Sequence, residues 1–289
     1  MKHTLLFFTA IFATVTMAFS QEEIKLYPQG AAESNGLEGQ EKHRDAEFLM
    51  NISEPRMIAY PAPQETANGT AVIICPGGSY AGVSYIKEGA EVAKWFNSLG
   101  VSAFVLFYRM PNGHYEIPLK DAQMAMEIVY NRAKEWKIDR KKIGIMGFSA
   151  GGHLASTAGT HFTNKKNRPA FMILGYPVVT MKDDYVHRGS RTMLMGKEPS
   201  NELILQYSNE LQVTKRTPPT FIVHAADDKT VPLKNSEQLV DAIKAFGTPA
   251  TLVVYEQGGH GFGMRQRGIP ADNWNEELKK WLVEQKLVK

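Results

Sequence analysis

Cysteine is almost absent from this sequence, which contains a single one, Cys75, among 289 residues. With one cysteine no internal disulfide can form, so the folded state depends on a hydrophobic core and not on cross-links. Cys75 ends the apolar run Ala71–Cys75, which is typical of a buried strand. We therefore interpret Cys75 as buried and inert, not as a nucleophile.

An excess of charge of one sign is also missing. The 33 Lys and Arg residues are nearly balanced by 30 Asp and Glu, which gives a formal net charge of +3. The basic residues are scattered along the chain, so nothing indicates a nucleic-acid partner. No cluster of His and Asp residues has the spacing of metal ligands. We therefore expect neither a metal ion nor another cofactor.

Long apolar runs are confined to the first twenty residues. A basic start, Met1–His3, is followed by the uncharged stretch Leu5–Phe19, and small residues lie just before Gln21. This pattern predicts a signal peptide at 1–20 that is removed, with an uncleaved anchor as the alternative. We expect a periplasmic or secreted protein with no membrane association after cleavage.

The rest of the chain, about 270 residues, is long enough to bury the core of one α/β domain. Residues 21–46 are polar and rich in glycine, and we expect them to form an extended N-terminal arm on the surface of a domain that spans 47–289. Apolar residues within 47–63 predict a two-stranded antiparallel hairpin at the edge of a sheet.

Strands and helices then alternate along the domain. Apolar runs typical of strands buried on both faces occur at 70–75, 101–108, 142–148, 171–177, 220–225 and 251–255. Apolar residues at helical spacing occur at 88–99, 118–136, 235–246 and 272–286. This alternation predicts the α/β class, with a mostly parallel central sheet flanked by helices.

Residues 181–216 interrupt this alternation. The segment is long and mixed in charge, and it contains one predicted helix at 201–211 with Ser200 as its N-cap. Long connections of this kind often shape substrate pockets. We therefore expect a short cap-like excursion over the active face of the sheet.

The strand predicted at 142–148 leads into the motif Gly147-Phe148-Ser149-Ala150-Gly151. A serine at a sharp turn between strand and helix has a strained backbone, and side chains two positions away on either side would collide with the flanking elements. Gly147 and Gly151 meet this requirement. We therefore predict a nucleophile elbow with Ser149 at its tip, the alternative being an ordinary glycine-rich turn.

A serine hydroxyl becomes a good nucleophile only beside a base that a third group orients. Asp227 and Asp228 follow the predicted strand at 220–225, and His260 lies between glycines after the next strand. Because the carboxyl ends of parallel strands meet at one edge of a sheet, we predict a triad in the chain order Ser149, Asp228, His260.

These motifs resemble the α/β-hydrolase superfamily, and within it the secreted bacterial acetyl xylan esterases and BD-FAE-like carbohydrate esterases. The resemblance covers about residues 66–285 and rests on Pro-Gly-Gly-Ser-Tyr at 76–80, on the elbow, and on Gly-His-Gly-Phe-Gly at 259–263. It implies the α/β-hydrolase fold. It also selects Asp228 over Asp227 as the acid, because the acid of these enzymes stands three residues before the Val of a Val-Pro pair.

The resemblance further implies a serine carboxylic ester hydrolase that deacetylates xylan-type carbohydrate esters through an acyl-enzyme. Its substrate would be an ester-bearing carbohydrate or a small ester. The N–H of Ala150 and that of Gly78 or Ser79 would stabilise the oxyanion. Ser79 stands where a third glycine is usual, which leaves open which of the two loop residues supplies the second donor.

Other functions are compatible with the same motifs. A serine peptidase of the prolyl-oligopeptidase type shares the triad order, but the roughly fifty residues between Gln21 and Thr70 are too few for the β-propeller that usually precedes it. A feruloyl esterase and a non-catalytic binding protein are further alternatives. Tyr80, Tyr176 and Phe262 are candidate substrate-binding residues, although core packing is the commoner role for an aromatic ring, and the preferred acyl group is left open.

Overall fold

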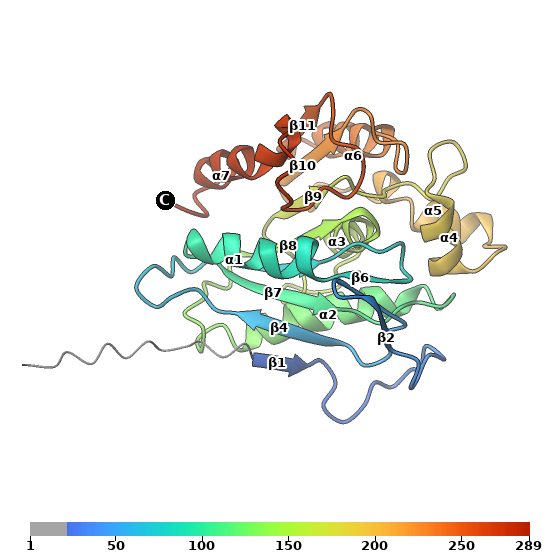
Figure 1. The fold of residues 1–289 in the computed structure, drawn as a ribbon, viewed down its shortest axis with the longest axis horizontal. Coiled ribbons are helices and arrows are strands. Elements are labelled where there is room, and N and C mark those ends of the chain that lie inside the picture. Colours follow the sequence, from blue (N-terminus) through green and yellow to red (C-terminus); the bar gives the residue numbers. More distant parts are fainter. Residues whose placement is uncertain (1–21) are drawn as a thin grey trace, which may run out of the picture.

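The computed structural model describes residues 22–289, so the predicted signal peptide at 1–20 lies outside the described residues. Eight strands form the main sheet: β1 (Glu22–Lys25), β4 (Arg56–Tyr60), β5 (Ala71–Cys75), β7 (Ser102–Phe107), β8 (Ile143–Phe148), β9 (Met172–Gly175), β10 (Thr220–Ala225) and β11 (Ala250–Tyr255). Their order across the sheet is β1-β4-β7-β5-β8-β9-β10-β11 (Figure 1). Only β4 runs against its neighbours in this sheet, so the predicted mostly parallel sheet is confirmed.

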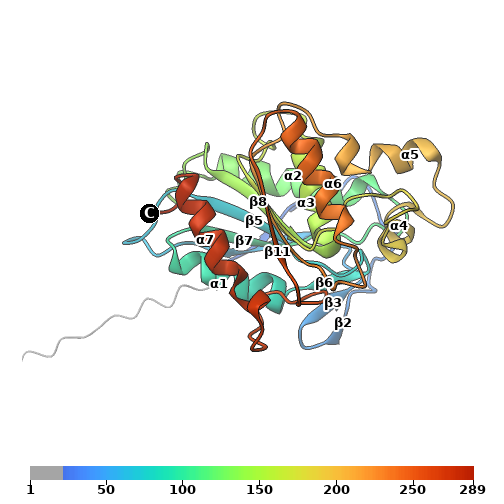
Figure 2. The same ribbon diagram turned by 90° about the horizontal axis from the view of Figure 1, so that it is seen from above.

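Helices cover both faces of this sheet. The principal ones are α1 (Glu91–Ser98), α2 (Glu116–Asn131), α3 (Ser149–Thr160), α6 (Lys234–Ala245) and α7 (Trp274–Glu284). Helices α1 and α7 lie on one face, whereas α2, α3 and α6 lie on the other (Figure 2). Strands β5, β7, β8 and β10 are buried along their whole length, which explains why they read as continuous apolar runs.

The prediction of an antiparallel hairpin within 47–63 is wrong. Its first half forms β3 (Phe48–Met50), which pairs with β2 (Lys42–Asp45) and β6 (Gly82–Ser84) in a separate three-stranded sheet. Its second half is β4, which joins the main sheet instead. Because β6 has only three residues and follows a glycine-rich loop, it has no periodic signal, and its pairing with β3 was not visible in the sequence.

The predicted N-terminal arm is only partly extended over the surface. Its start forms β1, which pairs with β4 at the edge of the main sheet, and its end forms β2, which is exposed along its whole length. Arg109, on the loop after β7, donates to the carbonyl of Glu33 at 2.6 Å. The segment is therefore bound to the domain by backbone pairing and by side-chain contacts.

Helix α2 ends at Asn131, five residues before the predicted end at 136. The chain leaves the helix in a turn, in which the N–H of Ile138 donates to the carbonyl of Ala133 at 2.8 Å and Lys137 has a φ of +54°. Trp136 nevertheless packs on Phe104, with ring centroids 4.8 Å apart. The apolar spacing therefore continued beyond the helix because the turn also packs against the core.

The excursion at 181–216 lies at the end of the sheet toward which the parallel strands point (Figure 1). It contains α4 (Arg188–Met195), which was not predicted, and α5 (Asn201–Gln206), which ends before the predicted 211. The Ser200 side chain accepts from the N–H of Leu203, so the predicted N-cap is confirmed.

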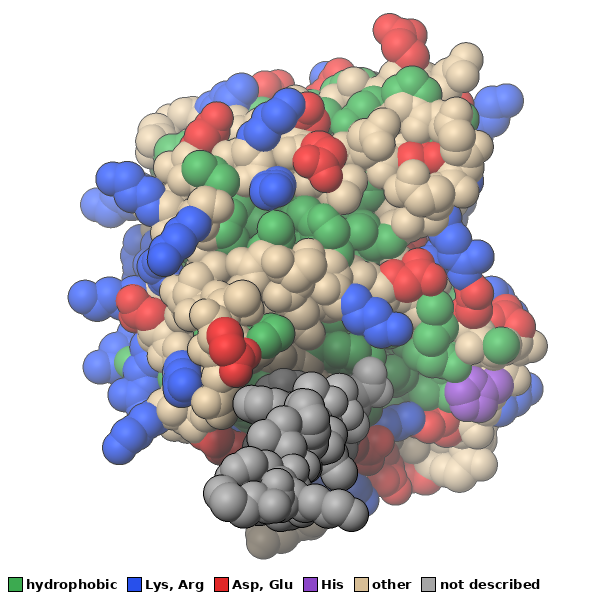
Figure 3. Space-filling view, turned by 60° about the vertical axis from the view of Figure 1, so that its left-hand side comes forward, with side chains coloured by type: hydrophobic (Ala, Val, Ile, Leu, Met, Phe, Trp, Pro, Cys, Tyr) green, Lys and Arg blue, Asp and Glu red, His purple; other side chains and the backbone are tan. Residues whose placement is uncertain are grey.

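Charged side chains of both signs lie next to one another on the face shown in Figure 3. Within residues 22–289, every helix is too short or too polar to span a bilayer.

Candidate active site

Ser149 stands at the tip of a sharp turn between β8 and α3. Its φ is +53°, a left-handed conformation that is strained for a residue other than glycine. A Cβ added to Gly147 would lie 2.0 Å from the carbonyl oxygen of Gly151, and one added to Gly151 would lie 2.1 Å from that of Cys75. The turn therefore has no room for a side chain at either glycine, which explains the motif.

His260 and Asp228 complete a hydrogen-bonded line with Ser149. The Ser149 Oγ lies 2.8 Å from His260 Nε2, and His260 Nδ1 lies 2.6 Å from Asp228 Oδ2. Because an ionised carboxylate only accepts, Nδ1 carries the proton and Nε2 accepts from the serine hydroxyl. The structure thus brings together the three side chains predicted for the triad.

The surroundings of Asp228 keep it ionised. Its Oδ1 accepts from the N–H groups of Thr230 and Val231 at 2.8 and 2.9 Å, and His224 Nε2 lies 3.3 Å from its Oδ2. Burial raises the pKa of this carboxyl, but the hydrogen bonds from His224 and His260 outweigh burial and hold the pKa well below its usual range. An ionised carboxylate in this position can orient the imidazole and stabilise its protonated form.

Asp227, the other candidate acid, contacts the backbone and not the ring of His260. Its Oδ1 accepts from the N–H groups of Gly258 and Gly259 at 2.9 and 2.7 Å. Its carboxylate therefore fixes the loop that carries His260, while Asp228 bonds the imidazole itself. Both aspartates follow β10, so their position in the chain does not show which one contacts His260, whereas these hydrogen bonds do.

The loop at 76–80 follows β5 and lies beside Ser149. Ser79 and Tyr80 have φ values of +56° and +61°, so this loop is strained as well. Within the described part of the chain, the N–H groups of Gly78, Ser79 and Ala150 donate to no protein acceptor. The three N–H groups predicted for the oxyanion hole are therefore left unpaired by the described residues and can donate to a bound oxygen.

The three aromatic residues predicted to bind substrate lie in the interior instead. Tyr80, Tyr176 and Phe262 are at most 1% exposed. The Tyr80 hydroxyl lies 2.8 Å from His153 Nδ1, the Tyr176 hydroxyl donates to Glu88, and the Phe262 ring packs edge-on against Tyr176. Each follows a strand as expected, but the ring turns toward the core because burial of a large apolar ring is strongly favourable.

His153, one turn into α3, lies in the interior between the elbow helix and the loop at 76–80. It is fully buried, and its Nε2 donates to the carbonyl of Tyr207 at 2.9 Å while its Nδ1 accepts from Tyr80. Burial lowers the pKa of His153 to about 4. His153 is therefore neutral near pH 7 and connects the elbow helix to the loop at 76–80 and to the excursion.

A cleft of about 510 Å³ opens over Ser149 and His260. The sequence did not indicate the residues that form much of its wall: Arg44, Asp45, Ala46, Glu47, Phe48, Ser84, Lys87, Glu88 and Thr230. One side is built by β2 and β3, where the Arg44 guanidinium lies 3.9 Å from the centroid of the Phe48 ring. None of the excursion residues lines this cleft.

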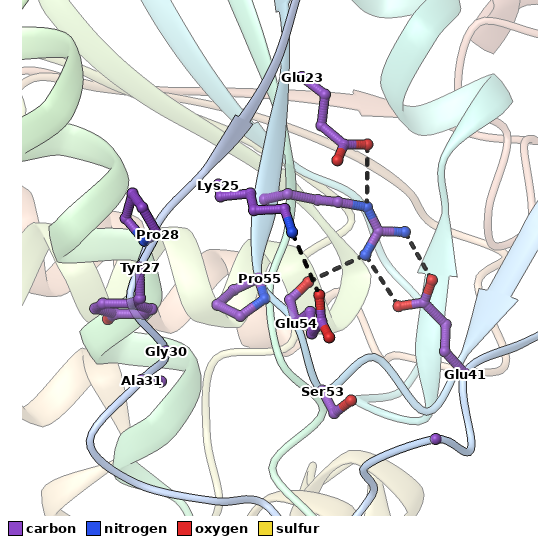
Figure 4. A pocket seen from close by; sticks show the side chains of 12 residues that line it. Glu23, Lys25, Tyr27, Pro28, Gly30, Ala31, Glu41, Ser53, Glu54 and Pro55 are labelled. Carbon is purple, nitrogen blue, oxygen red and sulfur yellow. Dashed lines mark hydrogen bonds and ion pairs between the residues drawn. The ribbon is translucent and has the colours of Figure 1, made fainter.

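A second hollow, of about 700 Å³, lies beside β1 and β4 and contains none of the predicted site residues (Figure 4). Its charged side chains pair with one another: Arg56 with Glu23 and Glu41, and Lys25 with Glu54. Among the described residues, no group of three or more His, Cys, Asp or Glu side chains could hold a metal ion.

Comparison with curated proteins finds relatives that are longer than this chain. The chain is 37% identical over 242 residues to an acetylxylan esterase of Xylanibacter ruminicola, a match that covers 81% of this chain and 50% of that protein. It is 31% identical over 280 residues to endo-1,4-beta-xylanase B of Butyrivibrio fibrisolvens, covering 87% of this chain and 44% of the relative. The chain thus spans about half the length of these relatives.

A solved structure gives a match over almost its whole length. The acetyl ester-xyloside bifunctional hydrolase of Caldicellulosiruptor lactoaceticus superposes with a TM-score of 0.80 at 32% identity, covering 93% of this chain and 98% of that one. The family model BD-FAE matches residues 58–243, which contain Ser149 and Asp228. The chain therefore belongs to the BD-FAE family and has the α/β-hydrolase fold.

Proposed function

We propose that this protein is a serine carboxylic ester hydrolase that removes acetyl groups from xylan-type carbohydrate esters. The observation that carries the proposal is the hydrogen-bonded line from Ser149 through His260 to Asp228, at 2.8 and 2.6 Å. The first distance is within the reach of proton transfer from Ser149 to His260, and the second is that of a charge-assisted hydrogen bond from His260 to Asp228.

In the proposed reaction, His260 Nε2 takes the hydroxyl proton while Ser149 Oγ attacks the ester carbonyl, and Asp228 stabilises the imidazolium. The N–H of Ala150 and one from the loop at 76–80 donate to the oxyanion. Collapse of the tetrahedral intermediate releases the sugar alcohol, which receives the proton from His260. Water, activated by the same imidazole, then hydrolyses the acyl-enzyme and releases the acid.

The acetylated carbohydrate substrate is supported by the relatives. Two of them are named for hydrolysis of acetyl esters: an acetylxylan esterase and an acetyl ester-xyloside bifunctional hydrolase. The cleft over Ser149 is lined largely by charged and small residues, which suits a hydrated sugar better than an extended apolar acyl chain.

The test compares the native protein with Ser149→Ala on 4-nitrophenyl acetate and on acetylated xylan. The variant should lose about 10⁴-fold or more in kcat and keep its circular dichroism and melting temperature. Unchanged turnover by Ser149→Ala would refute the proposal. Parallel assays with butyryl and feruloyl esters should give lower kcat/KM than the acetyl ester, and a preference for the feruloyl ester would favour the feruloyl esterase alternative.

We also propose that the protein is exported and that residues 1–20 are removed. The support is the sequence pattern alone: a basic start, an uncharged apolar core and small residues before Gln21. Mass spectrometry of the protein recovered from periplasm and medium should show an N-terminus at Gln21. An intact Met1 on the recovered protein would contradict cleavage.

A further inference from the structure

A buried carboxylate, Glu88, lies where the two loops of the active site approach each other. Glu88 is 3% exposed to solvent. Its Oε2 accepts from the N–H of Gly77, in the loop that carries the predicted oxyanion donors, at 2.8 Å, and its Oε1 accepts from the hydroxyl of Tyr176 at 2.8 Å. Both oxygens of the carboxylate are therefore engaged by the walls of the site.

Tyr176 extends this connection to the loop of the predicted base. The N–H of Gly263, three residues after His260, donates to the Tyr176 hydroxyl oxygen at 2.9 Å. The Tyr176 ring also packs edge-on against the imidazole, with centroids 4.9 Å apart. One carboxylate thus bonds the oxyanion loop directly and the His260 loop through a single hydroxyl.

The segment that carries Glu88 holds the same His260 loop at two more points. Lys87 donates from Nζ to the carbonyl of Gly261 at 2.8 Å, and its own carbonyl accepts from the N–H of Met264 at 3.1 Å. Both residues belong to a π-helical turn, Ile86–Ala90, that precedes α1. Such turns are rare and occur frequently at functional sites.

The oxyanion loop needs a restraint of this kind. Ser79 and Tyr80 both have left-handed φ values, which are strained for residues other than glycine, so the loop relaxes unless its surroundings hold it. Gly77 is in close contact with the nucleophile, since a Cβ added there would lie 2.9 Å from both Glu88 Oε2 and the Ser149 Cβ. A shift of Gly77 would therefore displace the N–H groups of the next two residues relative to Ser149.

We propose that Glu88 is a positioning residue for the hydrolysis, an inference that rests on the proposed function. Its carboxylate holds the oxyanion loop in register with Ser149 and, through Tyr176, sets the position of the His260 loop. Because both effects concern groups that act on the transition state, loss of Glu88 lowers kcat much more than it raises KM. A role in folding alone would lower the amount of active enzyme without this pattern.

The experiment measures kcat and KM on 4-nitrophenyl acetate for the native protein, Glu88→Ala and Glu88→Gln. Reactive sites are counted by titration with a phosphonate that modifies the serine, so that kcat refers only to folded enzyme. Glu88→Ala should lose about 10²–10³-fold in kcat, the effect of losing one oxyanion donor, with KM within about threefold. Glu88→Gln should lose about tenfold, because an amide can accept from Gly77 and donate to Tyr176.

Glu91→Gln is the matched control, since Glu91 lies one turn further along and is partly exposed. Among residues 22–289 its one ion-pair partner is Arg265, at 4.0 Å. It should keep native kcat. A Glu88→Ala variant with kcat per titrated site within threefold of native, or with a loss confined to KM, would overturn the inference. If the native protein does not hydrolyse the ester, the proposed function fails and the inference fails with it, whereas an active native protein with unaffected variants refutes the inference alone.

Discussion

Replacement of Asp228 by Asn tests the triad most sharply, because the surroundings decide how the amide must orient. Oδ1 of Asp228 accepts from two backbone N–H groups, those of Thr230 and Val231. Backbone amides cannot become acceptors, whereas an imidazole can change tautomer. The Asn oxygen will therefore face the backbone. Its NH₂ group will take the position of Oδ2, which lies 2.6 Å from Nδ1 of His260.

That orientation of the amide favours the other tautomer of the His260 imidazole. Nδ1 must then accept, so the ring proton moves to Nε2 and points at Ser149, which no longer has a base. In other triads the wrong tautomer costs about 10⁴ in kcat, or about 5 kcal/mol of transition-state stabilisation. We expect a loss of this size in the hydrolysis of 4-nitrophenyl acetate, with little change in fold because the two side chains have the same shape.

Asp227→Asn is the matched control. Among the described residues, the hydrogen bonds to the Asp227 side chain all go to Oδ1, from the N–H groups of Gly258 and Gly259. An Asn oxygen can therefore replace Oδ1 while the NH₂ group faces solvent. We expect activity within about fivefold of native, since the bonds from Gly258 and Gly259 are kept. Equal losses in the two variants, or a loss below tenfold for Asp228→Asn, would refute the tautomer argument.

Three further outcomes concern stability and reactivity. Asp121→Ala should lower the free energy of unfolding by about 3–5 kcal/mol in urea, because it leaves the buried Arg109 without its 2.6 Å partner; a loss below 1 kcal/mol would contradict this. His153, whose pKa is lowered to about 4 by burial, binds its proton first in the unfolded state, so stability should fall by up to about 3 kcal/mol as the pH drops from 6.5 to 4. His153→Gln should reduce this dependence of the unfolding free energy on pH. An unchanged dependence would show that other groups cause it. Burial raises the pKa of the Cys75 thiol, so Ellman's reagent should label it only after denaturation.

The central strands and the sharp turn that carries Ser149 could be predicted from the sequence because their physical requirements are local. A strand buried on both faces must be apolar throughout, as Ile73 and Ile145 illustrate. A serine with a left-handed φ needs glycines two residues away, which Gly147 and Gly151 supply. These demands act within a few residues, so a short window of sequence records them.

The walls of the site could not be predicted because they depend on contacts between distant segments. Phe48 reaches the oxyanion loop only because β3 pairs with β6, and three-residue strands have no periodicity that would reveal the pairing. The direction in which Tyr80, Tyr176 and Phe262 point depends on which cavity is left by the rest of the core. An aromatic residue that follows a strand can line a pocket or pack in the core, so its position in the sequence alone does not show which role it has.

The small sheet explains why the N-terminal segment belongs to the site although it carries none of the triad. A Cβ added to Gly78 would lie 2.1 Å from the carbonyl oxygen of Gly82 and 2.9 Å from Cζ of Phe48. The loop at 76–80 is therefore packed directly against β6 and β3, and β2 pairs with the other edge of β3. Glu88 restrains this loop from the side of the main domain, and the small sheet restrains it from the other side. A strained loop fixed from two sides keeps its N–H groups oriented before substrate arrives, which is what stabilisation of an oxyanion requires.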